Sequence, residues 1–305
     1  FMPEVKKIII NENISGQRLD NFLLNQLKGV PKSKVYSIIR KGEIRINSKR
    51  KKPSYKLVIG DEVRVPPIKT SSKESQFVPT NVIALLRASI VEENDDYIAL
   101  DKPEGIASHG GSGISIGVIE TIRNFGKSYR DAKLVHRLDK DTSGCQVIAK
   151  NNKFLRNCNK LISERKVKKT YQAIVHGNWI HKDGIYEINI EKNMLIGKER
   201  MVRISDGGKI AKTFFKVIES SKHFSLIQCE LITGRTHQLR VHLSELGFPI
   251  VGDKKYGIKE NKFPSSSGHK KRMYLHANSF ISEDLNIHII INPSKEFKKI
   301  LKNDE

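Results

Sequence analysis

The residues best suited to chemistry lie in one dense polar block, His136 to Gly144, which leads into an apolar strand. Within it, Asp139 is flanked by Arg137 and Lys140. Because nearby positive charge favours an ionised carboxylate, Asp139 can act as a nucleophile or a base at neutral pH. A loop that enters a buried strand can hold one such group on the face of a sheet. On this block alone, a turn cap paired with Arg137 is an equally good interpretation of Asp139.

A second block, Leu231 to His242, combines a turn with fixed positive charge. The glycine before Arg235 permits a tight turn, and the amide groups that follow it are suited to an anion. Arg235 and Arg240 add planar guanidinium donors. His237 and His242 lie five residues apart without the glutamate of a zinc hydrolase helix, so the sequence predicts no metal site.

Tyr171 is a third candidate, in a Lys-Thr-Tyr segment that opens an apolar strand. From the residues alone, a tyrosine in this place is more often part of the core than catalytic. Base stacking is the chemistry that it could add, since an aromatic ring replaces part of the stacking that an extruded base loses.

Together these blocks closely resemble the RluA-type pseudouridine synthases. The resemblance implies that Asp139 is the single catalytic acid and that Arg137 fills the gap left by a flipped base. It also implies that Arg235 pairs with Asp139 and keeps it ionised, and that Tyr171 stacks on the target base. Lys140 stands where the family usually has arginine, a change that keeps the positive charge.

The elements that must position these blocks are short β-rich runs from residue 89 onward, interrupted by helices at about 114–125, 151–164 and 235–246. This mixture predicts an α+β fold, with a catalytic domain at 89–305 built on a large mixed, mostly antiparallel sheet with flanking helices. Residues 67–88 begin with a turn-rich stretch and are predicted to be a linker.

Residues 1–66 carry 15 Lys and Arg against 6 Asp and Glu. Two helices followed by a small sheet resemble an S4-type RNA-binding domain, and the matching parts include residues 18–20, 34–47 and 60–63. A basic two-helix cap with a structural role is the alternative. We expect RNA contacts from basic side chains of the helices and loops, namely Arg18, Lys32, Lys34, Arg40, Lys41, Lys49, Arg50, Lys51 and Lys52.

The whole chain of 305 residues has a net charge of +22, which favours a polyanionic partner. Its three cysteines are widely spaced without a CxxC pair, so neither a disulfide framework nor a zinc ribbon is predicted. A reducing cytoplasm fits this pattern. No apolar run approaches the length that spans a bilayer, and we expect a monomer.

The family resemblance implies an isomerase without a cofactor, since pseudouridine formation is an internal rearrangement. The sequence carries no Rossmann fingerprint, P-loop or metal spacing. The match is closest to members that modify more than one uridine in bacterial 23S rRNA, so large-subunit rRNA is the predicted partner. The alternatives are a sister synthase acting on other rRNA or tRNA uridines, a non-catalytic S4-type assembly protein, and an RNA methyltransferase.

Overall fold

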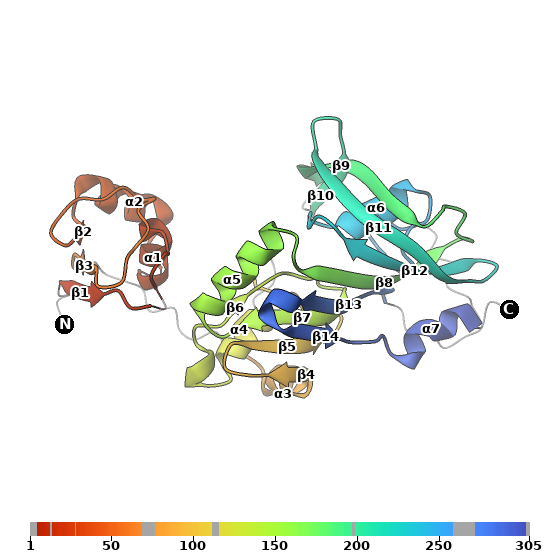
Figure 1. The fold of residues 1–305 in the computed structure, drawn as a ribbon, viewed down its shortest axis with the longest axis horizontal. Coiled ribbons are helices and arrows are strands. Elements are labelled where there is room, and N and C mark those ends of the chain that lie inside the picture. The colour runs from red at the N-terminus through yellow and green to blue at the C-terminus, as the bar shows by residue number, and fades with distance from the viewer. Residues whose placement is uncertain are drawn as a thin grey trace. The chain divides into compact units, whose positions relative to one another are not determined.

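The computed structural model describes residues 5–12, 14–27, 29–68, 77–111, 116–196, 199–258 and 272–302 (Figure 1). The chain divides into an N-terminal unit that ends at Phe77 and a second unit that begins at Val78. Part of the predicted linker, residues 69–76, lies outside the described residues, as do the first two residues of the predicted 114–125 helix.

The N-terminal unit contains two helices and a three-stranded sheet of order β1-β3-β2. Val35, Ile38 and Ile39 are buried on one face of α2, as helical periodicity requires. They share one apolar core with α1 and the sheet. The predicted two helices and small sheet are confirmed, and β1 was not predicted. The elements are β1 (Lys6–Ile9), α1 (Leu19–Gln26), α2 (Lys32–Lys41), β2 (Arg45–Ile46) and β3 (Glu62–Val65).

The second unit is built on an eleven-stranded sheet of order β10-β9-β11-β12-β8-β13-β7-β5-β4, with β14 beside β13 and β6 beside β7. Among the described strand pairs, β13 and β7 run parallel and the others antiparallel. The predicted fold class is therefore confirmed. The strands are β4 (Ile90–Glu93), β5 (Tyr97–Lys102), β6 (Lys133–Leu134), β7 (Ser143–Ala149), β8 (Lys168–His176), β9 (Gly184–Ile196), β10 (Glu199–Ile204), β11 (Lys209–Ser220), β12 (Phe224–Leu231), β13 (Leu275–Ser282) and β14 (Ile287–Ile290).

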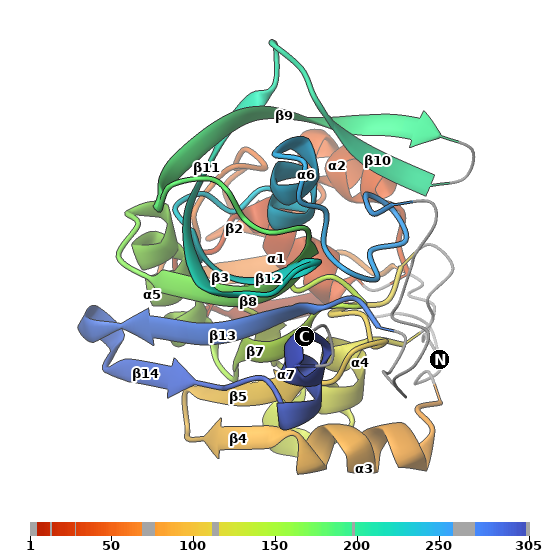
Figure 2. The same ribbon diagram turned by 90° about the vertical axis from the view of Figure 1, so that its right-hand side faces the viewer.

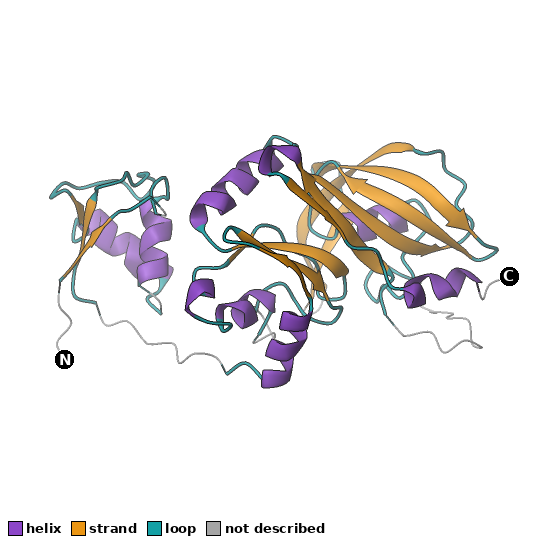
Figure 3. Ribbon diagram, turned by 60° about the horizontal axis from the view of Figure 1, so that its bottom comes forward, coloured by secondary structure: helices purple, strands orange, loops and turns teal. Residues whose placement is uncertain are grey.

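Helices flank this sheet (Figure 3), and α6 lies within the curve that β9, β11 and β12 form (Figure 2). Helix α3 occupies residues that we predicted to be linker, and that assignment was wrong. Its Leu86 is fully buried against Leu100 and Ile122, so α3 is part of the second unit's core. The helices are α3 (Thr80–Ala88), α4 (Val118–Arg123), α5 (Asn152–Ser163), α6 (Gln238–Glu245) and α7 (Lys295–Lys302), with 3₁₀ turns at Lys127–Tyr129 and Glu283–Leu285.

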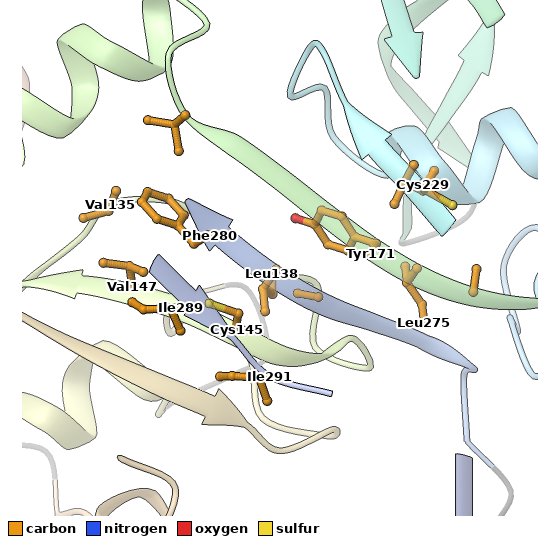
Figure 4. Packing of buried hydrophobic residues seen from close by; sticks show 14 of the residues in the cluster. Val135, Leu138, Cys145, Val147, Tyr171, Cys229, Leu275, Phe280, Ile289 and Ile291 are labelled. Carbon is orange, nitrogen blue, oxygen red and sulfur yellow. The ribbon is translucent and has the colours of Figure 1, made fainter. Parts of the chain in front are cut away.

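Strand β7 approaches β13 so closely that one position admits only glycine. Gly144 has a φ of +103°, and a Cβ built there would lie 2.2 Å from the carbonyl oxygen of Ala277. Its β7 neighbours Cys145 and Val147 are buried in the main core of the second unit (Figure 4). The loop that precedes β7 therefore has a rigid anchor at its C-terminal end.

Candidate active site

The loop between β6 and β7 carries Asp139 and is pinned from both sides. The Ser108 hydroxyl donates to the Leu138 carbonyl at 2.7 Å and accepts from the Leu138 amide at 2.9 Å. Within the loop, the Thr142 amide donates to the carbonyl of Asp139 at 3.1 Å. These bonds fix the backbone on each side of the carboxylate.

Lys102 supports the same loop from below the surface. Its ammonium donates to the carbonyl oxygens of Pro103 and Ile106, both at 2.8 Å, and of Lys140 at 3.2 Å. Burial lowers the pKa of Lys102 to about 7, because the charged form loses its hydration. Lys102 thus joins the end of β5 to the loop that carries Asp139.

The carboxylate of Asp139 is held by Arg240. The Arg240 Nη1 lies 3.0 Å from Asp139 Oδ2, while its Nε and Nη2 donate to both oxygens of Asp253 at 2.7 and 2.8 Å. The Asp139 side chain is 30% exposed, against 9% for Arg240 and 1% for Asp253. One guanidinium therefore joins a buried acid to an acid that is open to the cleft.

The charges of this trio are mutually stabilised. Burial alone would lower the pKa of Arg240, but its hydrogen bonds and charge interactions with Asp253 and Asp139 raise it. Burial alone would raise the pKa of Asp253, but its bonds to Arg240 lower it. Asp139 therefore faces a permanent positive charge, which suits a group that must be ionised to react.

The predicted pair of Arg235 with Asp139 was wrong. Arg235 is exposed, and its Nε donates to the Ile210 carbonyl on β11 at 3.2 Å. The physical reason lies at the start of α6, which begins at Gln238 rather than at 235. His237, in the left-handed region with a φ of +54°, turns the chain so that Arg240 lies in the buried first turn.

Tyr171 on β8 lines the cleft and is also part of the core. It is buried in one apolar cluster with Leu138 and Leu275 (Figure 4). Burial raises the pKa of Tyr171, so the phenol is protonated throughout the physiological range. A rigid, neutral ring is thereby fixed in the wall of the cleft that Asp139 also lines.

Arg137 is exposed at the cleft and rests on His109. Its Nη1 lies 2.9 Å from His109 Nε2, and His109 Nδ1 lies 2.6 Å from the Gly110 carbonyl. A guanidinium can only donate, so His109 Nε2 accepts from Arg137. A carbonyl can only accept, so His109 Nδ1 donates to Gly110. The Glu120 carboxylate accepts from the Gly110 amide at 2.9 Å, which holds this loop in place.

His136 begins the polar block that carries Asp139, but it has a structural role. Its Nε2 accepts from the Val147 amide at 3.1 Å. Its ring stacks on that of Phe280, with 5.3 Å between the two ring centres. Burial, followed by the charge of Lys169, lowers the pKa of His136 to about 3. A neutral imidazole used as a backbone acceptor is unsuited to proton transfer at neutral pH.

These side chains surround a cleft of about 1010 Å³ in the second unit. That volume is at the upper end of the range for ligand sites, about 300–1,000 Å³. Of the acids, Asp139 and Glu230 line it, and Glu230 pairs with Lys168 at 2.9 Å. The cations that line it are Arg137, Lys140, Arg165, Lys168, Lys169, Arg235 and Arg240. The cleft can hold an extruded nucleotide and the phosphates on either side of it.

Two negative findings apply to the part of the chain that the structure describes. No group of three or more His, Cys, Asp or Glu side chains there is arranged to hold a metal ion. None of the helices described is both long and apolar enough to cross a bilayer.

Known proteins resemble this chain over most of its length. Residues 96–245 match the family model described as RNA pseudouridylate synthase, and residues 17–63 match the S4 domain model. The chain is 44% identical to the ribosomal large subunit pseudouridine synthase C of Salmonella typhimurium, covering 90% of this chain and 88% of that protein. Identity to the protein of the same name from Pasteurella multocida is 43%, over 97% and 93%. The chain belongs to the RNA pseudouridylate synthase family.

Solved structures agree with this membership. Human RNA Pseudouridylate Synthase Domain Containing 4 matches with a TM-score of 0.59 at 25% identity, covering 73% of this chain and 96% of that one. Human RNA Pseudouridylate Synthase Domain Containing 1 matches with a TM-score of 0.56 at 26% identity, over 67% and 83%. The predicted family and the N-terminal S4 domain are thus confirmed.

Most of the predicted RNA contacts in the S4 domain are open to solvent. Arg18 is partly neutralised, because its Nε and Nη2 bind both oxygens of Asp20 at 3.1 and 2.6 Å. Lys51 is half-buried, with its ammonium 4.6 Å from the centre of the Tyr55 ring. Their role in RNA binding stays a prediction. The exposed ones are Arg18, Lys32, Lys34, Arg40, Lys41, Lys49, Arg50 and Lys52.

Sequence reasoning missed three residues that shape the site. Arg240 was noted only as a donor, although it is the partner of Asp139, and Asp253 was not connected with it. His237 was considered only as a metal ligand, yet its Nε2 lies 3.8 Å from Asp139 Oδ1. The sequence carried no signal for choosing Arg240, because the choice depends on the helix beginning at Gln238.

Proposed function

We propose that this synthase isomerises uridine to pseudouridine in large-subunit (23S) rRNA, at more than one position. It acts as a monomer, without a small-molecule cofactor, in the cytoplasm. The observation that carries the proposal is the carboxylate of Asp139, paired with Arg240 and open to a basic cleft. The ribosomal large subunit named in the relatives' titles supports the substrate. The three free, buried cysteines fit a reducing compartment.

In the proposed mechanism Asp139 acts on the ribose of an extruded uridine. The bond from C1′ to N1 breaks, the uracil turns, C5 joins C1′, the proton on C5 is released to solvent, and N1 takes up a proton. Asp139 either attacks C1′ and is later displaced by C5, or removes the C2′ proton to give a glycal and returns that proton when C5 joins C1′. Both routes require an ionised carboxylate beside the ribose, which the contact with Arg240 favours.

Extruding the nucleotide costs roughly a few kcal/mol of lost stacking, which the protein must offset. Arg137 is exposed, and it can exchange its contact with His109 for the vacated gap, which it enters as a planar cation. The rigid ring of Tyr171 can stack on the uracil in the cleft. Arg137 therefore stabilises the RNA stack that the nucleotide has left, and Tyr171 stabilises the uracil in the cleft.

The substrate is tested by mapping pseudouridines in rRNA from cells with and without the gene, by carbodiimide-stop primer extension. We expect at least two stops in large-subunit rRNA to disappear and to return when the gene is restored. Loss of stops in small-subunit rRNA or tRNA instead would assign the protein to a sister activity. An unchanged map would remove the proposed substrate altogether.

The S4 domain is tested by replacing Lys49, Arg50, Lys51 and Lys52 with glutamine in the full-length chain. If each contacts one phosphate, the slope of log binding constant against log salt should decrease in magnitude by about 3, since each contact contributes roughly 0.7–0.9. Filter binding to a large-subunit rRNA fragment measures this slope. The control is Lys295→Gln with Lys299→Gln on α7, and equal slopes in the two variants would contradict the assignment.

A further inference from the structure

His237 is held in one tautomer by a chain of hydrogen bonds that begins on β10. The Val202 amide donates to the hydroxyl oxygen of Tyr256 at 3.0 Å, and that oxygen lies 2.9 Å from His237 Nδ1. The Val202 amide N–H donates to a lone pair of the Tyr256 oxygen, so the hydroxyl hydrogen of Tyr256 remains available to donate to Nδ1 of His237. Nδ1 of neutral His237 therefore accepts, and the ring proton resides on Nε2.

That proton faces the catalytic carboxylate. His237 Nε2 lies 3.8 Å from Oδ1 of Asp139, while Arg240 binds Oδ2 at 3.0 Å. A movement of about 1 Å turns the first contact into a hydrogen bond, and such contacts commonly tighten when substrate binds. Each carboxylate oxygen then keeps one lone pair for the ribose.

A β-bulge makes the Val202 amide available. The register of β10 against β9 shifts between Met201 and Val202, at the residue that donates to Tyr256. The Val202 side chain is buried with Val241 of α6, and the ring of Tyr256 packs on the same cluster. Bulges beside active sites commonly redirect a group in this way. The bulge therefore connects the β9–β10 hairpin to Asp139.

The surroundings of His237 favour its neutral form. The charged groups that face it are Asp139, Asp253, Arg240 and Lys255, two acids and two bases. Burial is the largest influence and lowers the pKa of His237; Asp139 and Asp253 raise it, but Arg240 and Lys255 act with burial and the net direction is down. At neutral pH the imidazole is thus an uncharged donor, which complements the fixed cation on the other oxygen.

We propose that His237 is a positioning residue that donates from Nε2 to Asp139, with its tautomer set by Tyr256 and the β10 bulge. The proposal rests on the catalytic role of Asp139. It extends the site to a residue that orients the carboxylate without touching the substrate. Losing this donor should slow the chemical step and leave RNA binding unchanged.

The test compares His237→Asn with His237→Gln in the full-length enzyme. Asparagine tolerates the left-handed backbone at 237 and can accept from Tyr256, but it cannot reach Asp139. The longer glutamine carries an amide donor to about the place of Nε2. We expect His237→Asn to lower kcat by about 10- to 100-fold with KM for RNA within about twofold, and His237→Gln to recover most of this loss.

A pH profile separates positioning from a purely structural role. A donor to the ionised carboxylate favours the ionised form, so the acid limb of kcat should lie at higher pH in His237→Asn than in wild type or His237→Gln. Tyr256→Phe should lower kcat several-fold in the wild type and add nothing to His237→Asn. Additive losses, or a lower melting temperature with an unchanged acid limb, would overturn the proposal.

Asp139→Asn distinguishes a failure of the positioning role of His237 from a failure of the catalytic role of Asp139. If that variant is inactive and His237→Asn has wild-type kcat, the positioning role fails and the catalytic role of Asp139 stands. If Asp139→Asn is active, the proposed mechanism itself fails.

Discussion

Replacing Asp139 with asparagine is expected to eliminate turnover, lowering kcat by about 10⁴-fold or to below detection. Asparagine has nearly the same shape, but it is neither a nucleophile nor a base, so both routes to pseudouridine are closed. RNA affinity should change by less than about threefold, because the cations that line the cleft remain. Tritium release from C5-labelled uridine in RNA measures turnover, and filter binding measures affinity.

The matched control for this variant is Asp141→Asn. Asp141 lies two residues away in the same loop and is exposed. It should keep near-wild-type tritium release, since the same charge is lost from the loop without loss of the carboxylate that Arg240 binds. Equal losses in the two variants would mean that net charge at the loop, and not a specific carboxylate, is what the reaction needs. Tritium release by Asp139→Asn would remove Asp139 from its role.

The sequence predicted the place of Asp139 better than its arginine partner, for a physical reason. Asp139 precedes an apolar strand, and strand β7 holds it in place as such a pattern implies. Arg235 and Arg240 are alike in charge and five residues apart, so the choice between them depends on where α6 begins. The left-handed residue His237 decides that start, and a single sequence does not reveal which residue adopts such a conformation.

The fold shows the same division between local and distant information. Local apolar patterns predicted α5 and most strands of the second unit, but β6, β10 and β13 were missed. The start of β13, Leu275 to Ala277, was interpreted as turns and cleft-lining loops, and that interpretation was wrong. Helix α3 was missed since it follows a turn-rich stretch and buries only Leu86 fully. Strand β1 is only four residues long and mostly exposed, so its pairing with β3 leaves no alternation in sequence. Strand order in the large sheet depends on contacts between distant segments.

Replacing Arg240 with methionine is expected to lower both activity and stability. Methionine fills similar space but leaves Asp253, only 1% exposed, without its guanidinium partner. Breaking a buried pair in this way costs about 3–5 kcal/mol of unfolding free energy. The loss of a charged hydrogen bond to Asp139 should lower kcat by a further factor of about 10 to 100. Denaturant unfolding and single-turnover kinetics measure the two effects.

A second substitution separates the effects. In the double variant Arg240→Met with Asp253→Asn, the buried charge at position 253 is removed together with its guanidinium partner. The backbone amides of Lys255 and Tyr256 can still donate to the asparagine oxygen. Stability should therefore return towards that of Asp253→Asn, while kcat stays low because Asp139 has lost its guanidinium partner. Recovery of kcat together with stability would show that Arg240 acts only by holding the fold.

Arg235→Met is the comparison that decides between the two arginines. Its guanidinium is exposed and binds a backbone carbonyl, so stability and kcat should stay near wild type. KM for RNA should rise a few-fold, because Arg235 lines the cleft and can neutralise a phosphate. A collapse of kcat in Arg235→Met, with Arg240→Met active, would restore the pair expected from the family pattern. The opposite result would assign the catalytic ion pair to Arg240, because the bonds of its Nε and Nη2 to Asp253 direct its Nη1 to Asp139.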